Sequence, residues 1–104
     1  MKKYMAGLIS ILAFSALLLA GEGSWSGVVS DDHCGAKHAT ASDAAASCVA
    51  KCVAGGAKYV LVSEGKVYKL TAQDKFASLA GKSVKVSGTE DAGTITVASV
   101  EAAQ

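Results

Sequence analysis

The sequence predicts a mainly β fold, a small five-stranded barrel with one helix between the first and second strands and a short helix between the third and fourth. Three observations predict it. Short runs rich in β-branched residues recur through the chain, polar glycine-containing turns separate several of them, and two alanine-containing segments with helix-start signals interrupt them. No proline and no low-complexity linker divides the chain, so we expect one domain.

The first three predicted strands are residues 25–30, 59–63 and 66–71. The second and third of these flank Glu64 and Gly65, a pair typical of a two-residue hairpin turn. The sequence therefore predicts that these two strands are neighbours in the sheet.

The last two predicted strands are residues 83–88 and 94–100. The first alternates strictly, which places Val84 and Val86 on one face and Lys85 on the other. The second follows a polar turn and is rich in threonine and valine.

Two helices are predicted between the strands. The first begins at a loose capping box, residues 40–43 with Thr40 as the cap, and ends at the glycine pair of residues 55–56. Its apolar stripe consists of Ala45, Cys48, Val49 and Cys52. The second begins at a similar box, residues 71–74, and ends at Gly81. Its apolar face consists of Phe76, Leu79 and Ala80.

Three strands, a helix and two strands follow one another as in an OB-fold barrel. Residues 59–101 resemble the later part of small OB-like domains, and the helix inserted after the first strand is the departure from that pattern. In OB-folds this connection borders the binding face, although the fold alone does not specify a ligand.

Residues 1–20 have the pattern of a cleavable signal peptide. Lys2 and Lys3 precede an apolar run over residues 5–19, which is short for a membrane-spanning helix, and small residues follow it. We therefore expect residues 21–104 to form a single OB-like domain that is periplasmic or secreted and leaves the membrane after cleavage.

The charge of the mature chain argues against nucleic-acid binding. Once the first two lysines are removed, eight lysines face nine carboxylates, and the chain contains no arginine. Such a domain has neither the positive field nor the bidentate side chains that nucleic-acid recognition usually employs. The expected partner is a small ligand, a metal or a protein.

The residues with distinctive chemistry gather between Asp31 and Cys52. They are His33, Cys34, His38, Cys48 and Cys52. Through the motifs Asp-x-x-Cys-Gly-x-x-His, Cys-x-x-x-Cys and Gly-Ala-Lys-Tyr-Val-Leu-Val, the mature chain resembles a family of small exported bacterial proteins of unknown function. The resemblance covers nearly all of the mature chain. It implies an OB-like barrel with a Cys/His-bearing insertion and supplies no activity.

The first hypothesis for this cluster is a disulfide, as expected in an oxidising compartment. Cys48 and Cys52 are one helical turn apart, where a regular helix does not allow a bridge. Cys34 is therefore the expected partner of Cys48 or of Cys52. Closing that loop would stabilise the domain by about 3 kcal/mol.

The second hypothesis is a zinc or copper site. Cys48 and Cys52 share a helix face, and Cys34 and His38 would complete a Cys₃His tetrahedron, with His33 as the alternative ligand. The spacing is not that of a standard zinc finger or ribbon.

Other interpretations stay open beside these two. A cysteine left unpaired near a histidine is a candidate reactive thiol, but no Cys-x-x-Cys motif is present. Buried, inert thiols would explain the same residues. Asp31 and Asp32 are adjacent acids of the kind that usually cap turns or face solvent. The aromatic residues are expected in the core rather than on a stacking surface; they are Trp25, Tyr59, Tyr68 and Phe76.

The sequence favours binding over catalysis because it contains no recognisable set of nucleophile, base and orienting residue. The expected function is an exported small-ligand or metal-binding module stabilised by a Cys34 disulfide. The alternatives are the Cys₃His metal site and a purely structural or interaction domain.

Overall fold

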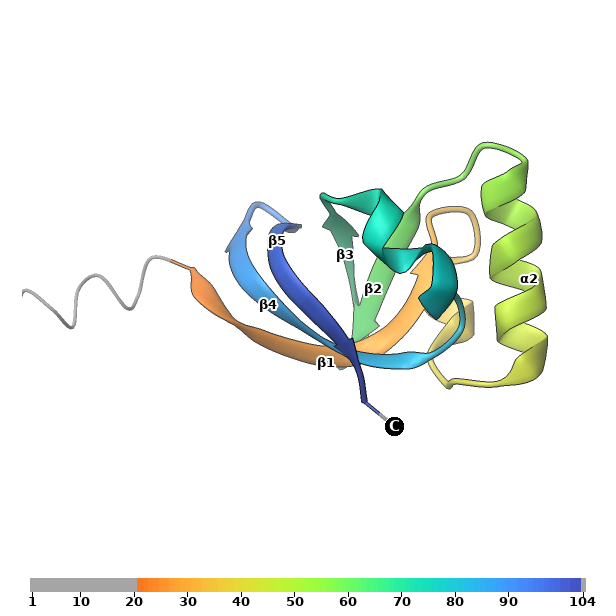
Figure 1. Cartoon of the computed structure of the whole chain (residues 1–104), viewed down its shortest axis with the longest axis horizontal. Helices are drawn as coiled ribbons and strands as arrows, with labels where there is room; N and C mark the ends of the chain where they lie inside the picture. The colour runs from red at the N-terminus through yellow and green to blue at the C-terminus, as the bar shows by residue number, and fades with distance from the viewer. Residues whose placement is uncertain (1–20, 104) are drawn as a thin grey trace, which may run out of the picture.

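The structure, a computed structural model, describes residues 21–103, so the predicted signal peptide lies outside the described residues. Strands β1 to β5, helix α2 and two 3-10 helices, η1 and η2, follow one another along the chain (Figure 1). Their bounds are β1 (Glu22–Asp31), η1 (Gly35–His38), α2 (Asp43–Ala54), β2 (Tyr59–Ser63), β3 (Lys66–Leu70), η2 (Gln73–Leu79), β4 (Ser83–Asp91) and β5 (Thr94–Ala102). Within this part of the chain, no helix is long and apolar enough to cross a membrane.

The five strands close into a barrel in the order β1-β2-β3-β5-β4. β1 pairs antiparallel with β4 through residues 22–28 and with β2 through residues 28–31. The barrel closes where β3 and β5 run parallel, with Leu70 opposite Ile95. This strand order is that of an OB-fold, and α2 lies between the first and second strands, so the predicted fold class is confirmed.

Two local features allow this closure. Gly27 lies where β1 passes from β4 to β2, and a Cβ atom there would collide with the carbonyl oxygen of Val62, so the close approach of the two strands requires glycine. The predicted hairpin turn is confirmed between β2 and β3. Glu64 and Gly65 have φ values of 50° and 81°, the positive values that a type I′ turn needs at both central positions.

The core fills the barrel from both the strands and η2. Its members are Val29, Leu61, Leu70, Phe76, Val84, Val86 and Ile95. Val84 and Val86 are fully buried while Lys85 between them is exposed, as the alternation of β4 predicted. Phe76 is fully buried, and three other aromatic side chains pack against the core. They are Trp25, Tyr59 and Tyr68. The aromatic residues therefore belong to the packing, as expected.

The helix starts differ from the predicted ones. α2 is capped by Ser42, whose hydroxyl accepts a hydrogen bond from the backbone N–H of Ala45 at 3.0 Å, so Thr40 is not the cap. η2 is a 3-10 helix that follows a left-handed Ala72, with φ of 54°, and has no side-chain cap. Thr71 instead accepts a hydrogen bond from the backbone N–H of Val97. A tertiary contact thus occupies the hydroxyl expected to cap η2, whereas α2 begins at Asp43 and is therefore capped by Ser42, two residues after the predicted cap.

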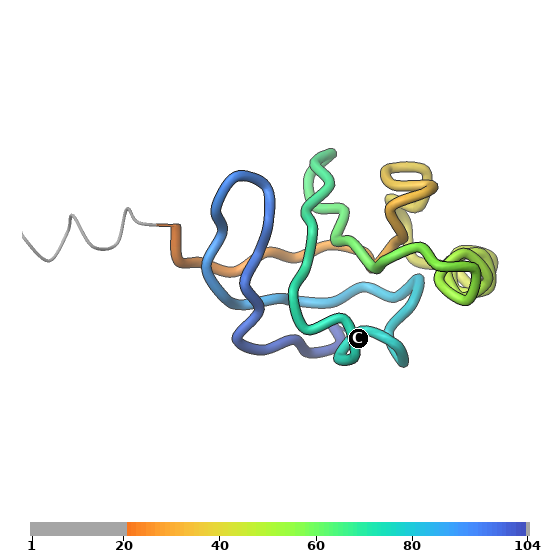
Figure 2. The backbone as a smooth tube through the Cα atoms, turned by 90° about the horizontal axis from the view of Figure 1, so that it is seen from above, coloured from red at the N-terminus to blue at the C-terminus, as the bar shows by residue number. Residues whose placement is uncertain are grey.

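The segment between β1 and β2 lies outside the barrel, at the end away from the β4–β5 turn (Figures 1 and 2). η1 packs against β1, β2 and β3. α2 is held at its start, where the backbone N–H of Ser42 donates to the carbonyl of Gly81 at 3.3 Å. A Cβ at Gly81 would collide with the backbone of Ala46, so glycine permits this contact. The cysteine-bearing helix is thus fixed against the connection between η2 and β4, and it also contacts β1.

Candidate metal centre

The site begins at a tight turn that closes β1. The side chain of Asp31 is fully buried, and its Oδ1 accepts hydrogen bonds from the backbone N–H groups of His33 at 2.9 Å and Cys34 at 2.8 Å. Such a turn is a common role of aspartate. It reverses the chain and sets the position of Cys34 over the end of the barrel.

η1 then carries the chain to His38. The hydroxyl of Ser30 on β1 donates to the carbonyl of Gly35 at 2.8 Å, which ties the start of η1 to the sheet. The backbone N–H of Lys37 donates to the carbonyl of Cys34 at 3.1 Å. These bonds hold His38 beside Cys34, and both residues are half-buried.

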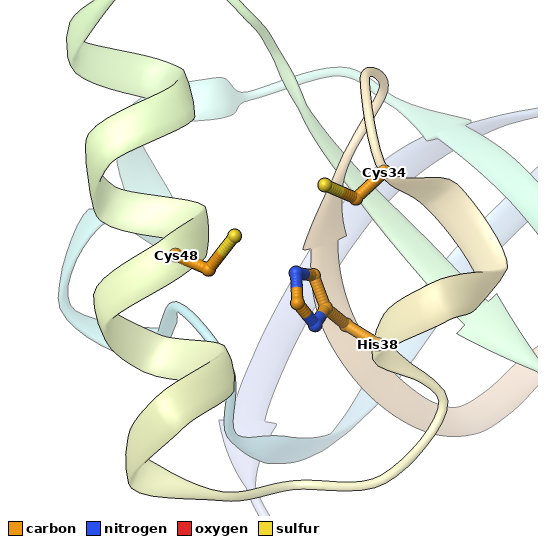
Figure 3. Close-up of side chains that lie close together, drawn as sticks. All are labelled: Cys34, His38 and Cys48. Atoms are coloured by element: carbon orange, nitrogen blue, oxygen red, sulfur yellow. The ribbon is translucent and has the colours of Figure 1, made fainter.

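α2 supplies the other two cysteines. Ala45 and Val49 are buried and anchor the helix, as the predicted stripe requires. Cys48 and Cys52 lie on the same side and are half-buried. Figure 3 shows the side chains of Cys34, His38 and Cys48 pointing toward one another, the first two from the connection after β1 and the third from α2.

Two groups of possible ligand atoms meet at Cys34. In the first donor group, one atom each of Cys34, His38 and Cys48 lie within 4.8 Å of one another. In the second donor group, the same holds for Asp31, Cys34 and Cys52. The structure thus divides the predicted Cys₃His set between two donor groups that share Cys34, and it adds Asp31 to the second.

His33, the alternative ligand in the sequence analysis, belongs to neither donor group. Its side chain is exposed and lines an open surface hollow beside Cys52, together with Asp32 and Lys51. The turn at Asp31 sends this imidazole away from Cys34, while η1 brings His38 back toward it.

The surroundings of two of the thiols, Cys34 and Cys52, favour their protonated forms. Burial raises the pKa of the Cys34 thiol, and the negative charge of Asp31 raises it further. The same two causes, with the neighbouring thiols, raise the pKa of Cys52 to about 11. A cation that binds these sulfurs must displace their protons.

Two buried polar atoms in the described residues have no hydrogen-bond partner, and both belong to this site. They are Oδ2 of Asp31 and Nε2 of His38. Native proteins rarely leave such atoms unpaired, and each case calls for an explanation such as an ion.

The predicted disulfide stays a prediction. All three cysteines are free thiols in the structure. The sulfur of Cys34 lies within 4.8 Å of the sulfurs of both Cys48 and Cys52, so either pairing needs only a local adjustment.

Sequence reasoning missed Asp31 as a possible ligand. An acid at the end of a strand, next to a second acid, has the pattern of a solvated or capping residue. Asp32 fits that pattern, since it is exposed and accepts a hydrogen bond from the backbone N–H of Lys58. The signal that indicates the role of Asp31 is the spacing Asp-x-x-Cys. In a turn of this length the carboxylate accepts a hydrogen bond from the backbone N–H of the cysteine and lies close to it.

Comparisons of the chain with protein-family models, with curated proteins and with solved structures find no match. The family resemblance drawn from the motifs therefore stays a prediction, and the function has to be argued from the site itself.

Proposed function

We propose that this protein is a metal-binding module that acts outside the cytoplasm and holds a thiolate-preferring cation, Zn²⁺ or Cu⁺. The ligands are Cys34, His38 and Cys48, with Cys52 within reach of Cys34. The observation that carries the proposal is the convergence of two thiols and an imidazole from separate parts of the chain, all within 4.8 Å of one another.

The dimensions of the first donor group suit one ion. The centre of a triangle with that side lies about 2.8 Å from each corner, whereas zinc bonds are about 2.3 Å to sulfur and 2.0–2.1 Å to imidazole nitrogen. Shifts of about 0.5 Å for each sulfur and about 0.7 Å for the imidazole nitrogen close the difference. Thiolate and imidazole together are the donors that select Zn²⁺ and Cu⁺ over hard cations.

The environment of His38 supports the same assignment. Its Nε2 is buried without a partner, and leaving such an atom unpaired costs about 1–3 kcal/mol. A structural histidine would normally have both nitrogens paired or exposed. A cation bound to Nε2 would remove this cost, so the bound ion would stabilise the fold as well as occupy the site.

A disulfide between Cys34 and one of the helix cysteines is the second candidate, favoured by the short distances from Cys34 to both other sulfurs. In that case the cysteines stabilise the insertion, and the ligand of the module lies elsewhere.

Thermal unfolding of the full exported chain tests the two candidates. Under reducing conditions, Zn²⁺ or Cu⁺ at a hundred times the dissociation constant should stabilise the wild type by about 2.7 kcal/mol. His38→Ala and Cys48→Ser should each weaken binding at least about tenfold. His33→Ala is the matched control, because this exposed histidine lies outside both donor groups, and it should bind as the wild type does.

The disulfide predicts a different set of results. The oxidised protein would contain one titratable thiol, reduction alone would lower its melting temperature, and neither histidine variant would change it. A reduced wild type whose unfolding ignores both metals would overturn the metal proposal.

A further inference from the structure

We infer that the centre binds two zinc ions, bridged by the thiolate of Cys34, with the second ion held by Asp31 and Cys52. The inference rests on the proposed function and deepens it, since it assigns Asp31 and Cys52 to a separate position. It also selects Zn²⁺ as the metal.

The geometry supports two positions because Cys34 belongs to both donor groups. His38 and Cys48 accompany it in the first, and Asp31 and Cys52 in the second, each group within 4.8 Å. The two groups have no other member in common. A thiolate sulfur has enough lone pairs to bind two soft cations at once. An ion bound by the first donor group leaves the three donor atoms of the second group in a triangle of the same size.

The state of Asp31 points to a cation in the second position. The side chain is fully buried, and Oδ1 is occupied by two backbone N–H groups, while Oδ2 has no partner. A buried carboxylate is usually paired or coordinates a metal. Carboxylate oxygen is an established zinc ligand, whereas Cu⁺ prefers sulfur and nitrogen.

The charges of the donors match two divalent ions. Three thiolates and one carboxylate carry four negative charges, and His38 binds metal as the neutral ring. With one Zn²⁺ in the first donor group, Cys52 keeps its proton and the carboxylate of Asp31 stays uncompensated, whereas a second Zn²⁺ displaces that proton and the two ions neutralise all four charges. The surface hollow beside Cys52 gives the second ion a route from solvent.

Zinc titration of the reduced full chain, followed by native mass spectrometry, tests the inference. The wild type should take up two zinc ions. Asp31→Asn and Cys52→Ser should each take up one. Asn keeps the Oδ1 atom that accepts the two backbone hydrogen bonds, so this variant removes the charge and leaves the turn. Asp32→Asn, an exposed neighbour, is the matched control and should take up two.

The outcomes separate this inference from the proposed function. A wild type that binds one zinc overturns the two-ion centre and leaves the proposed function standing, whereas one that binds none overturns both. If Asp31→Asn and Cys52→Ser still bind two, the second ion lies elsewhere and the inference fails. X-ray absorption of the loaded wild type should show zinc–zinc scattering at about 3.5–4 Å, the separation found in two-metal sites; its absence would also refute the bridge.

Discussion

The two ends of the barrel differ in how completely the chain satisfies its own polar groups. At the β4–β5 end, the backbones pair up to the turn, and the carboxylate of Glu90 accepts a hydrogen bond from the backbone N–H of Gly93 at 2.9 Å. At the α2 end, Asp31 and His38 each bury a polar atom without a partner. The first end is complete by itself. At the second end the two unpaired atoms lower the stability of the fold, and a ligand that pairs with them would restore it.

The largest expected effect comes from a substitution in the barrel core, which is complete without a ligand. Val86 is fully buried in the core and faces inward from β4. Val86→Asp should lower the free energy of unfolding by about 4 kcal/mol, because it buries a charge that has no partner. Lys85→Gln on the exposed face is the control and should change it by less than about 0.5 kcal/mol. Urea denaturation measures both, and equal losses would mean that the inward and outward faces of β4 are misassigned.

A smaller effect concerns the thiols of the incomplete end. Burial and the charge of Asp31 raise the pKa of Cys52 from 9.0 to about 11. A raised pKa lowers the thiolate fraction at a given pH, so metal-free Cys52 at pH 8 should react with iodoacetamide about a hundred times more slowly than an ordinary cysteine. The rate should rise as the pH approaches 11. Timed alkylation followed by peptide mass spectrometry gives the rate.

The control for this prediction is a variant that removes the charge of Asp31. Asp31→Asn removes the negative charge and should speed the alkylation of Cys52, whereas Asp32→Asn should leave it unchanged. A Cys52 that reacts in the wild type as fast as in the unfolded chain would contradict the closed arrangement of the site.

The smallest expected effect tests how α2 is held at its start. Ser42 caps the helix through its hydroxyl, so Ser42→Ala should destabilise the protein by about 1 kcal/mol. Thr40→Ala changes an exposed residue ahead of the cap and should stay within about 0.5 kcal/mol. Differential scanning calorimetry compares the two. A larger loss at Thr40 than at Ser42 would favour the capping box expected from the sequence.

The sequence by itself determined the elements of the barrel. The period-two alternation around Val84, the Glu64-Gly65 turn and the stripe of Ala45 and Val49 depend on neighbours a few residues apart, and each predicted a local structure that the fold contains. The sequence also indicated the segment that carries the Cys/His cluster, since Cys34 and Cys48 could be recognised by residue type alone.

Only the tertiary structure decided which of these residues meet. Whether His33 or His38 faces Cys34 depends on the turn that Asp31 makes with the backbone and on the packing of η1 against β1 to β3. The burial of Asp31 itself depends on the same packing, which gives this acid an environment that Asp32 next to it does not share. The turn at Asp31 is local, but the packing of η1 against β2 and β3 joins segments far apart in the chain, and local patterns carry no information about that packing. The cysteines and histidines of the candidate site were therefore recognisable by residue type, while the part of Asp31 and the arrangement around Cys34 were not.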